Sequence, residues 1–438
     1  MKNQNGYVDS FAKLIQCPTV SNSGHEYFEA FHKVLDEEFP HVTATCQKIE
    51  IGNDVLLYKW TGKSSERPLV LMAHQDVVPA VDGNWKYPPY SATVEDGVMY
   101  GRGSMDCKNT LFSTMQAVEE LIEEGFVPEQ DVYLSYSDGE EVSGPGAEMA
   151  RDWFVANGIT PFLVIDEGGA IIKKALSIMK KDVAAVGIVE KGYADVKFIA
   201  RGKGGHSSQP PKNTPIARLA AFVNSCEKHP VFKPHMTKAA RDMIYYLGDA
   251  LSPVLRFFCK LIPINGWWVS RLAPKINASY GNTMFATTMV FTMSQGSAAP
   301  NVIPQEAWVN ANIRFAPDES FEEGFKKLEK RAKKFGLEME IGTHRNASAT
   351  VDINGEGYKM FKKALNEYYP DVAVMPYLMF GGTDCRTMQP IAKHAIRCTP
   401  CALSFKQLGG MHAANETVDI DSLNKCVGFF VKFIRDYK

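Results

Sequence analysis

Short apolar runs alternate with helical patterns over the first 170 residues of the chain, and this alternation constrains the fold most strongly. Two stretches, residues 26–39 and 108–125, have the spacing of amphipathic helices. The apolar runs are strand-like: VLLYKW (55–60), PLVLMAH (68–74), VYLSY (132–136) and FLVID (162–166). Strands that alternate with helices predict an α/β fold, with a mixed, largely parallel sheet flanked by helices. In such a sheet, sites form beyond the carboxyl ends of the strands.

The pattern changes near residue 192, where strand-like segments begin to alternate apolar and polar residues. A solvated amphipathic helix is expected over residues 321–336. We therefore predict a second, α+β domain over residues 192–348, inserted into a first domain of residues 1–191 and 349–438. An aromatic stretch at about 229–280 is expected to add helices, and it fits either simple packing helices or an apolar lid or interfacial patch.

Composition restricts the partners. With 45% hydrophobic and 22% charged residues, the chain is typical of globular proteins. A net charge of -2 gives no footprint for nucleic acid or for an anionic membrane. The N-terminus has no apolar core of an export signal, no run is long enough to span a bilayer, and the nine cysteines are odd in number and scattered. We expect a cytoplasmic protein with reduced thiols and without a membrane span.

Acidic side chains follow the predicted strands in an unusual concentration. Two acidic doublets, Glu140–Glu141 and Asp166–Glu167, end apolar runs, and Asp106 precedes the helix of residues 108–125. Their mutual repulsion calls for cations. His74 and His412 complete a set of nitrogen and oxygen donors that suits zinc or a similar divalent ion. Taken singly, Asp106 would fit a helix cap and His74 a structural role.

Spacing adds two details to this site. Asp76 lies two residues beyond His74, so on a strand both side chains point to one face, where a carboxylate can orient a histidine ligand. Adjacent residues point in different directions, so one glutamate of a doublet can bind metal while its neighbour faces a water molecule.

Five segments carry a resemblance to a known family. They are AHQDVVP (73–79), YGRGSMDCK (100–108), SDGEEVSG (137–144), DEGG (166–169) and GMHAANE (410–416). In this order they resemble the dinuclear zinc peptidases grouped with aminoacylase, carboxypeptidase S, acetylornithine deacetylase and succinyl-diaminopimelate desuccinylase. The aromatic insertion is most similar to the carboxypeptidase S branch. The resemblance implies a zinc-peptidase catalytic domain and an inserted ferredoxin-like lid or dimerisation domain.

The resemblance also implies roles for individual residues. His74 would bind one zinc ion, Asp106 would bridge both ions, and Glu141 and His412 would hold the second. Either Asp166 or Glu167 would be the remaining ligand of the first ion, and Glu167 is preferred. Glu140 would be the general base and Asp76 would clamp His74. The implied cofactors are two Zn²⁺ ions, with Co²⁺ or Mn²⁺ as substitutes.

Further roles fall in the inserted domain and near the C-terminus. His206, in the G-x-x-G-H-S stretch, would stabilise the oxyanion, often from the partner subunit, although an exposed-loop histidine would otherwise be solvated. Asn301 and Arg314 resemble substrate contacts, but Arg314 also fits a solvated strand face. In MFGGTDCRTM, Arg386 and the backbone of Gly382 would hold a substrate carboxylate.

These roles together imply hydrolysis of an amide bond beside a free carboxylate, in short peptides or N-acyl amino acids. An N-acyl amino acid deacylase of amino-acid metabolism is the alternative, and a non-catalytic, metal-stabilised binding protein is a second one. The expected partners are a small-molecule substrate and a second copy of the chain, in a homodimer formed through the inserted domain.

Overall fold

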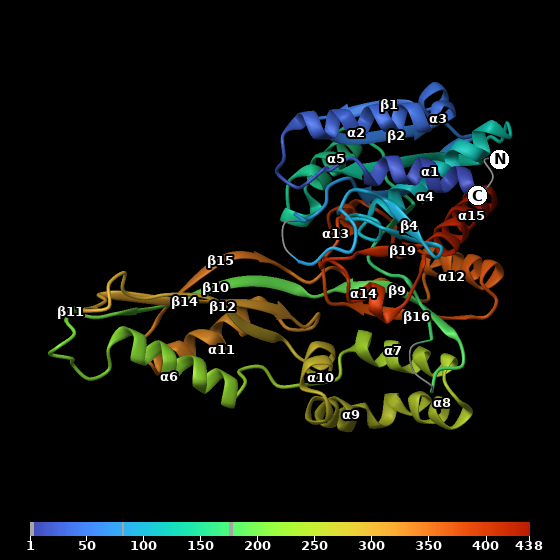
Figure 1. Cartoon of the computed structure of the whole chain (residues 1–438). Helices are drawn as coiled ribbons and strands as arrows, with labels where there is room; N and C mark the ends of the chain where they lie inside the picture. Colours follow the sequence, from blue (N-terminus) through green and yellow to red (C-terminus); the bar gives the residue numbers. More distant parts are fainter. Residues whose placement is uncertain (1–3, 81–82, 175–177) are drawn as a thin grey trace.

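The larger of two lobes is built on a ten-stranded sheet (Figure 1). The computed structural model describes residues 4–80, 83–174 and 178–438. β16 (Val372–Met379) pairs with β9 beside the main order. That order is β1 (Gln47–Ile51), β2 (Val55–Trp60), β6 (Gln130–Ser137), β3 (Ser64–His74), β7 (Leu163–Asp166), β17 (His394–Arg397), β9 (Asp182–Glu190), β8 (Ile171–Ile172) and β18 (Ala402–Leu403).

Side chains of β3 alternate between the two faces of this sheet, as the period of two in a strand requires. Leu69 and Leu71 belong to a core that also contains α4 (Lys108–Glu123), α12 (Glu356–Tyr368) and α15 (Ile420–Asp436). Val70 and Met72 belong to the core of the opposite face, with α5 (Gly146–Ala156) and α13 (Cys385–Met388). The predicted mixed, largely parallel sheet flanked by helices is confirmed.

The smaller lobe has a four-stranded antiparallel sheet in the order β12 (Thr288–Gln295), β14 (Glu306–Phe315), β10 (Gly192–Arg201), β15 (Glu338–Arg345). α6 (Pro215–Lys228) and α11 (Phe321–Lys333) pack on this sheet (Figure 1). The chain order of strand, helix, two strands, helix and strand is ferredoxin-like. Only Lys191 separates β9 from β10, so an almost continuous strand joins the lobes. The limits 192–348 of the inserted domain stay a prediction.

The aromatic insertion forms α7 (Lys238–Leu247), α8 (Pro253–Lys260), α9 (Ile262–Ile276) and α10 (Ala278–Phe285). α7 packs against β16 of the larger lobe, through small or flexible residues such as Ala239, Ala240 and Met243. The insertion therefore contributes to the core of the larger lobe, although it lies in the sequence inside the predicted inserted domain. α8 and α9 lie on the outer side of this lobe (Figure 1).

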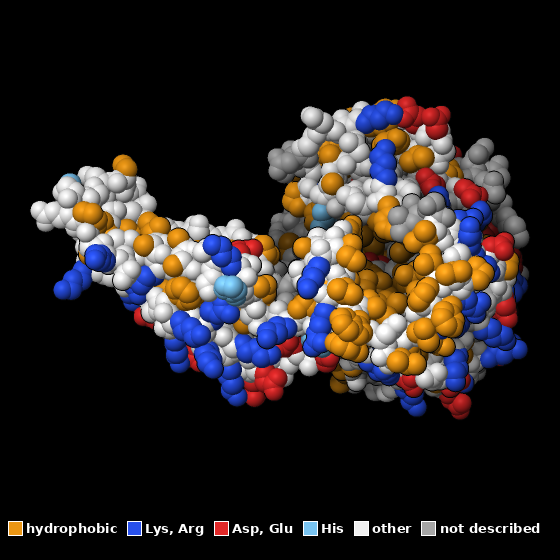
Figure 2. Space-filling view, turned by 90° about the horizontal axis from the view of Figure 1, so that it is seen from below, with side chains coloured by type: hydrophobic (Ala, Val, Ile, Leu, Met, Phe, Trp, Pro, Cys, Tyr) orange, Lys and Arg blue, Asp and Glu red, His pale blue; other side chains and the backbone are white. Residues whose placement is uncertain are grey.

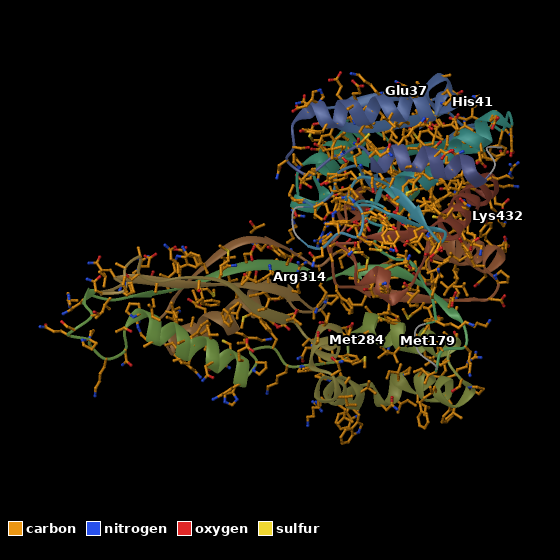
Figure 3. The ribbon with its side chains drawn as sticks, viewed as in Figure 1. Glu37, His41, Met179, Met284, Arg314 and Lys432 are labelled. Atoms are coloured by element: carbon orange, nitrogen blue, oxygen red, sulfur yellow. The ribbon has the colours of Figure 1, made fainter. Side chains whose placement is uncertain are left out.

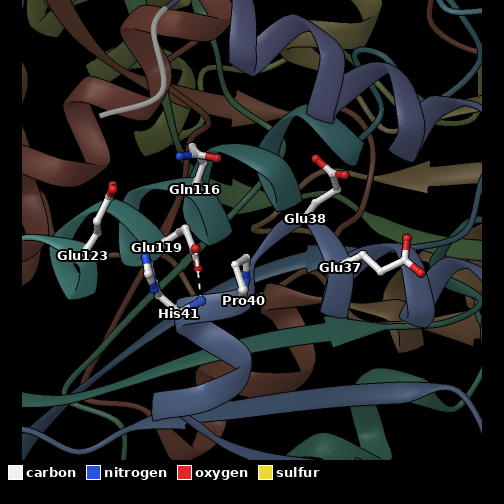
Figure 4. A pocket seen from close by; sticks show the side chains of 7 residues that line it. All are labelled: Glu37, Glu38, Pro40, His41, Gln116, Glu119 and Glu123. Atoms are coloured by element: carbon white, nitrogen blue, oxygen red, sulfur yellow. Dashed lines mark hydrogen bonds between the residues drawn. The ribbon is translucent and has the colours of Figure 1, made fainter.

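The larger lobe also contains a polar cavity. α2 (His25–Glu38), α3 (Pro40–Thr45) and α4 border a cavity of about 330 Å³ that is rich in glutamates (Figure 4). One of them, Glu119, accepts hydrogen bonds from the backbone N–H groups of His41 and Val42, at 3.1 and 2.8 Å. These bonds cap the N-terminus of α3.

Among the described residues, no helix has both the length and the hydropathy that crossing a membrane demands.

Candidate metal centre

Three neighbouring parallel strands deliver acidic and imidazole side chains to one edge of the large sheet. β3 lies between β6 and β7 and runs parallel to both. β3 ends at His74, β7 ends at Asp166, and β6 leads into the short 3-10 helix Glu140–Val142. Because carboxyl ends of parallel strands share an edge, the predicted ligands come together there.

Asp106 lies between the two predicted histidine ligands. One of its carboxylate oxygens is 3.2 Å from His74 Nε2, and the other is 3.0 Å from His412 Nε2. His412 Nε2 also lies 2.9 Å from Glu141 Oε2. Donor atoms of His74, Asp106 and Glu141 all lie within 4.8 Å of one another. A carboxylate that presents one oxygen to each of two imidazoles has the geometry of a ligand shared by two ions.

Asp76 organises this centre through both its backbone and its side chain. The Nδ1 of His74 is 2.9 Å from the Asp76 carbonyl oxygen and 3.4 Å from its carboxylate. Donation from Nδ1 to this carbonyl leaves Nε2 free for a metal ion. The Asp76 carboxylate also accepts hydrogen bonds from the Ser21 hydroxyl at 2.7 Å and from the backbone N–H groups of Glu140 and Glu141 at 3.1 and 3.2 Å.

The two acidic residues after β7 differ in what they contact. Asp166 accepts hydrogen bonds from the backbone N–H groups of Glu167 at 2.9 Å and Cys385 at 2.7 Å, so both of its carboxylate oxygens are bound to backbone groups. Burial raises the pKa of Glu167 well above its ordinary value, and repulsion from Asp106, Asp166 and Glu140 raises it further. The Glu167 carboxylate thus faces the anionic cluster. This arrangement supports Glu167 as the ligand, which stays a prediction.

The donor set fits divalent cations. Burial raises the pKa of Glu140 well above its ordinary value, and repulsion from Asp384, Asp106 and Glu141 raises it further. Within the described residues, the buried Oε1 of Glu141 has no hydrogen-bond partner. Crowded carboxylates with an unused buried oxygen, together with two imidazoles, are satisfied when cations bind among them.

His206 and Asn301 lie elsewhere. Both are exposed, and the backbone N–H of Ser207 donates to the Asn301 carbonyl at 3.0 Å. β11 (Gly205–His206) pairs with β13 (Val302–Ile303) at the end of the smaller lobe farthest from the larger one (Figure 1). A single chain in this conformation therefore does not bring these two residues to the metal centre, and their roles stay predictions.

Arg386 lies near the junction of the lobes. Its Nε is 3.5 Å from the buried Glu190 carboxylate, and its Nη2 donates to the Asn346 carbonyl at 2.5 Å. Gly382 lies beside Arg386 and Glu190, since a Cβ built on it would be 3.5 Å from the Arg386 guanidinium and 3.4 Å from the Glu190 carboxylate. Arg314 of β14 lies at the end of the smaller lobe nearest the larger one (Figure 3).

Positive charge accumulates around Arg386. Burial lowers its pKa, and Arg345, Arg397 and Arg314 lower it further. Arg397 is bound to the Glu190 carboxylate, with its Nε 2.5 Å from Oε1. The surplus of guanidinium groups over the single Glu190 suits an anionic substrate group.

Comparison with known proteins decides the family. Residues 70–436 match the sequence model of the family described as peptidase family M20/M25/M40. The chain belongs to this family. It is 30% identical to the N-fatty-acyl-amino acid synthase/hydrolase PM20D1 of Bos taurus, with 96% of this chain and 86% of that protein covered. It is 28% identical to the probable carboxypeptidase S-like 2 of Dictyostelium discoideum, with 93% and 79% covered.

Solved structures of M20 enzymes share the fold. The M20 family metallo-carboxypeptidase Sso-CP2 of Sulfolobus solfataricus superposes with a TM-score of 0.72 at 18% identity, over 99% of each chain. The resemblance expected from the five sequence segments, and membership of a metallopeptidase family, are thus confirmed.

In this M20 chain, Glu416 is a positioning residue that the sequence analysis missed. Its fully buried carboxylate accepts hydrogen bonds from Arg102 Nη1 at 2.7 Å and from the backbone N–H groups of Gly103, Met105 and Asp106 at 3.1, 2.8 and 3.0 Å. It therefore joins the loop of His412 to the loop of Asp106. The signal was present, because the segment GMHAANE that supplies His412 ends in this glutamate.

Asp384 and Arg345 were missed as well. Asp384 accepts a hydrogen bond from the Ser137 hydroxyl at the end of β6, and burial and the nearby Asp166 raise its pKa to about 7. In the segment MFGGTDCRTM, the resemblance implied roles only for Arg386 and the backbone of Gly382, not for Asp384. Arg345 is the last residue of β15, and its Nη2 lies 3.5 Å from the backbone carbonyl oxygen of Ser143. It therefore connects the smaller lobe to the loop after Glu141.

Proposed function

We propose that this M20 peptidase hydrolyses an amide bond beside a free carboxylate, in short peptides or N-acyl amino acids. Two divalent cations would be held by His74, Glu167, Asp106, Glu141 and His412. The observation that carries the proposal is the placement of Asp106, with one oxygen 3.2 Å from His74 and the other 3.0 Å from His412. The names of the two relatives, an N-fatty-acyl-amino acid synthase/hydrolase and a probable carboxypeptidase S-like protein, support the substrate class.

The proposed mechanism assigns proton transfer to Glu140. When bound, the divalent ions would polarise the scissile carbonyl and lower the pKa of a water molecule from about 15.7 toward 7. Glu140 accepts the proton of this water and delivers it to the leaving nitrogen. The Asp76 carboxylate holds the backbone N–H of Glu140 at 3.1 Å, which fixes the turn that carries the base. The paired glutamates thereby divide the two tasks, since Glu141 binds metal and Glu140 moves the proton.

The substrate carboxylate is proposed to bind beside Arg386 and the backbone of Gly382, near Arg314 and Arg345. Glu190 stays neutralised by Arg397 when Arg386 turns to the substrate, because Arg397 Nε lies 2.5 Å from the same carboxylate. A planar guanidinium matches a carboxylate through two parallel hydrogen bonds.

A homodimer belongs to the proposal. The exposed His206 and Asn301 would act at the metal centre of a partner subunit, where His206 would stabilise the oxyanion. Zinc is the proposed ion because two imidazoles and several carboxylates suit it. A cytoplasmic location is proposed from the nine cysteines, all of which are free thiols.

The decisive experiment is a substrate panel with metal-reconstituted enzyme. It contains dipeptides, N-acetyl amino acids and N-fatty-acyl amino acids, each with a free carboxylate and as the matched carboxamide. We expect turnover of free-carboxylate substrates only, and loss of turnover with a chelator. Preference for N-acetyl substrates would identify the deacylase of amino-acid metabolism. Stoichiometric metal binding without hydrolysis of any amide would instead identify a binding protein.

A further inference from the structure

Helices α8 and α9 form an exposed apolar surface on the larger lobe, here named the α8–α9 face. Its most exposed apolar side chains are Ile276 (86%), Ile264 (77%), Val254 (67%), Phe257 (61%), Phe258 (57%), Trp268 (54%) and Trp267 (50%). The rings of Phe257 and Phe258 are 5.8 Å apart, and those of Trp267 and Trp268 are 4.4 Å apart. Figure 2 shows hydrophobic side chains gathered on this side. Isolated exposed apolar residues are ordinary, but a contiguous group marks an interaction site.

The orientation of α9 is the reverse of a helix that packs only on its own protein. It buries Ile262 at its start, but farther along it buries only Gly266 and Ser270, and it exposes Trp267 and Trp268. Gly266 lies close beneath Met236, where an added Cβ would be 3.1 Å from the Met236 side chain. None of the residues of α8 is buried. Because most of the large aromatic groups turn outward, the surface that would remove them from water lies outside the chain.

Charge around the α8–α9 face is predominantly positive. Residues 250–305 contain no Asp or Glu and four basic residues, Arg256, Lys260, Arg271 and Lys275. Asp249, which precedes this stretch, pairs with both Arg256 at 3.2 Å and Lys260 at 3.1 Å, and so balances only one of them. The face is therefore net positive although the whole chain carries -2. The total charge, from which no anionic membrane partner was expected, conceals this local excess.

We propose that the α8–α9 face docks on the surface of an anionic lipid bilayer, with its aromatic side chains among the headgroups. Tryptophan and phenylalanine beside lysine and arginine are the composition of helices that lie in a membrane interface. The cytoplasmic leaflet attracts such basic groups, by about 1 kcal/mol for each. A second copy of the chain fits less well, because a two-fold contact would place this positive face against itself. The proposal is independent of the catalytic one.

Vesicle flotation tests the proposal. The full chain is mixed with phosphatidylcholine vesicles that contain or lack phosphatidylserine, at low and high salt. Wild type is expected to float with the anionic vesicles and to dissociate at high salt. Trp267→Ser with Trp268→Ser is expected to reduce the bound fraction at least about tenfold, from the lost apolar contact. Arg271→Glu with Lys275→Glu is expected to abolish the preference for phosphatidylserine.

Matched variants serve as controls. Lys326→Glu with Lys330→Glu makes the same change in net charge on the exposed side of α11, and Val127→Ser with Val155→Ser removes exposed apolar groups elsewhere. Both are expected to bind like wild type. Thermal unfolding of every variant verifies folding.

Three results would overturn the docking proposal. They are failure of wild type to float, equal binding by the face variants and the controls, or a dimer in sedimentation velocity that the tryptophan variant abolishes while vesicle binding is absent.

Discussion

The Glu416 carboxylate accepts a hydrogen bond from the backbone N–H of Asp106 at 3.0 Å, and it also forms an ion pair with Arg102 at 2.7 Å. Both partners of this ion pair are buried. The loop that carries His412 and the loop that carries Asp106 therefore form one unit, and the metal centre depends on a residue that would touch no metal.

Glu416→Gln tests this dependence. The substitution keeps the shape but leaves the Arg102 guanidinium buried without its counter-charge, so we expect a loss of about 3–5 kcal/mol in the free energy of unfolding. Because the Asp106 loop loosens, metal affinity should fall about 10–100-fold. Urea unfolding and metal competition measure the two effects. Arg102→Met with Glu416→Gln should recover part of the stability, and additive losses in the double variant would show that the pair is not coupled.

Glu140→Gln separates proton transfer from metal binding. The variant retains His74, Asp106, Glu141 and His412, so its metal content should equal that of wild type. Its kcat should fall by at least about a hundredfold, because the general base is lost. Metal analysis and steady-state kinetics on the same preparation give both values. As a control, Glu148→Gln on the exposed surface of α5 should leave kcat unchanged. Wild-type turnover by the Glu140 variant would remove its role.

Arg386→Met tests the carboxylate anchor. Loss of a charge-assisted hydrogen bond costs about 1.5–3 kcal/mol, so KM for a free-carboxylate substrate should rise about 10–100-fold. KM for the matched carboxamide should stay the same. Because Arg397 still pairs with Glu190, the variant should remain folded. A similar change for both substrates would assign Arg386 a structural role.

His235 and Asp318 form a pair in the smaller lobe, with Nε2 and Oδ1 2.9 Å apart. The hydrogen bond that His235 donates to the Asp318 carboxylate raises the pKa of His235, and the same bond lowers the pKa of Asp318. The contribution from His235 is complete below its unfolded pKa of about 6.5 and is lost as pH rises through the raised folded value. The contribution from Asp318 is complete above about 3.9 and is lost as pH falls through the lowered folded value.

The pair should therefore stabilise the protein most between about pH 4 and 6.5. His235→Ala should cost at most about 1 kcal/mol in that window, since both side chains are partly exposed, and nothing near pH 9. Urea unfolding of metal-free protein at the two pH values measures the difference. An equal cost at both would show that packing, not charge, connects these residues.

The parts of the site that follow from strand ends could be predicted from the sequence. His74 ends one strand with an unambiguous apolar run, and Glu141 and Glu167 follow two others. Parallel strands bring their carboxyl ends to one edge of the sheet. His412 has no such strand, and its place beside Asp106 could be expected only from the resemblance. It adopts a φ of 59°, and its loop is held by Glu416, which is a tertiary contact without a local signature.

Other features could not follow from local patterns. The helical spacing of α7 does not say which sheet it packs on, and its small residues fit against β16 of the larger lobe. The apolar residues of α9 do not reveal which of them face outward, because the pattern is apolar on most of its circumference. The distance of His206 from the metal centre depends on how the lobes are arranged, which no spacing along the chain encodes.

The most direct test of the account is an anomalous difference map from crystals of metal-reconstituted protein, recorded on both sides of the metal absorption edge. The account predicts two peaks that flank the Asp106 carboxylate, one bound by His74 and the other by Glu141 and His412. A single peak, or peaks out of reach of Asp106, would contradict the shared-carboxylate centre from which the proposed hydrolase is derived.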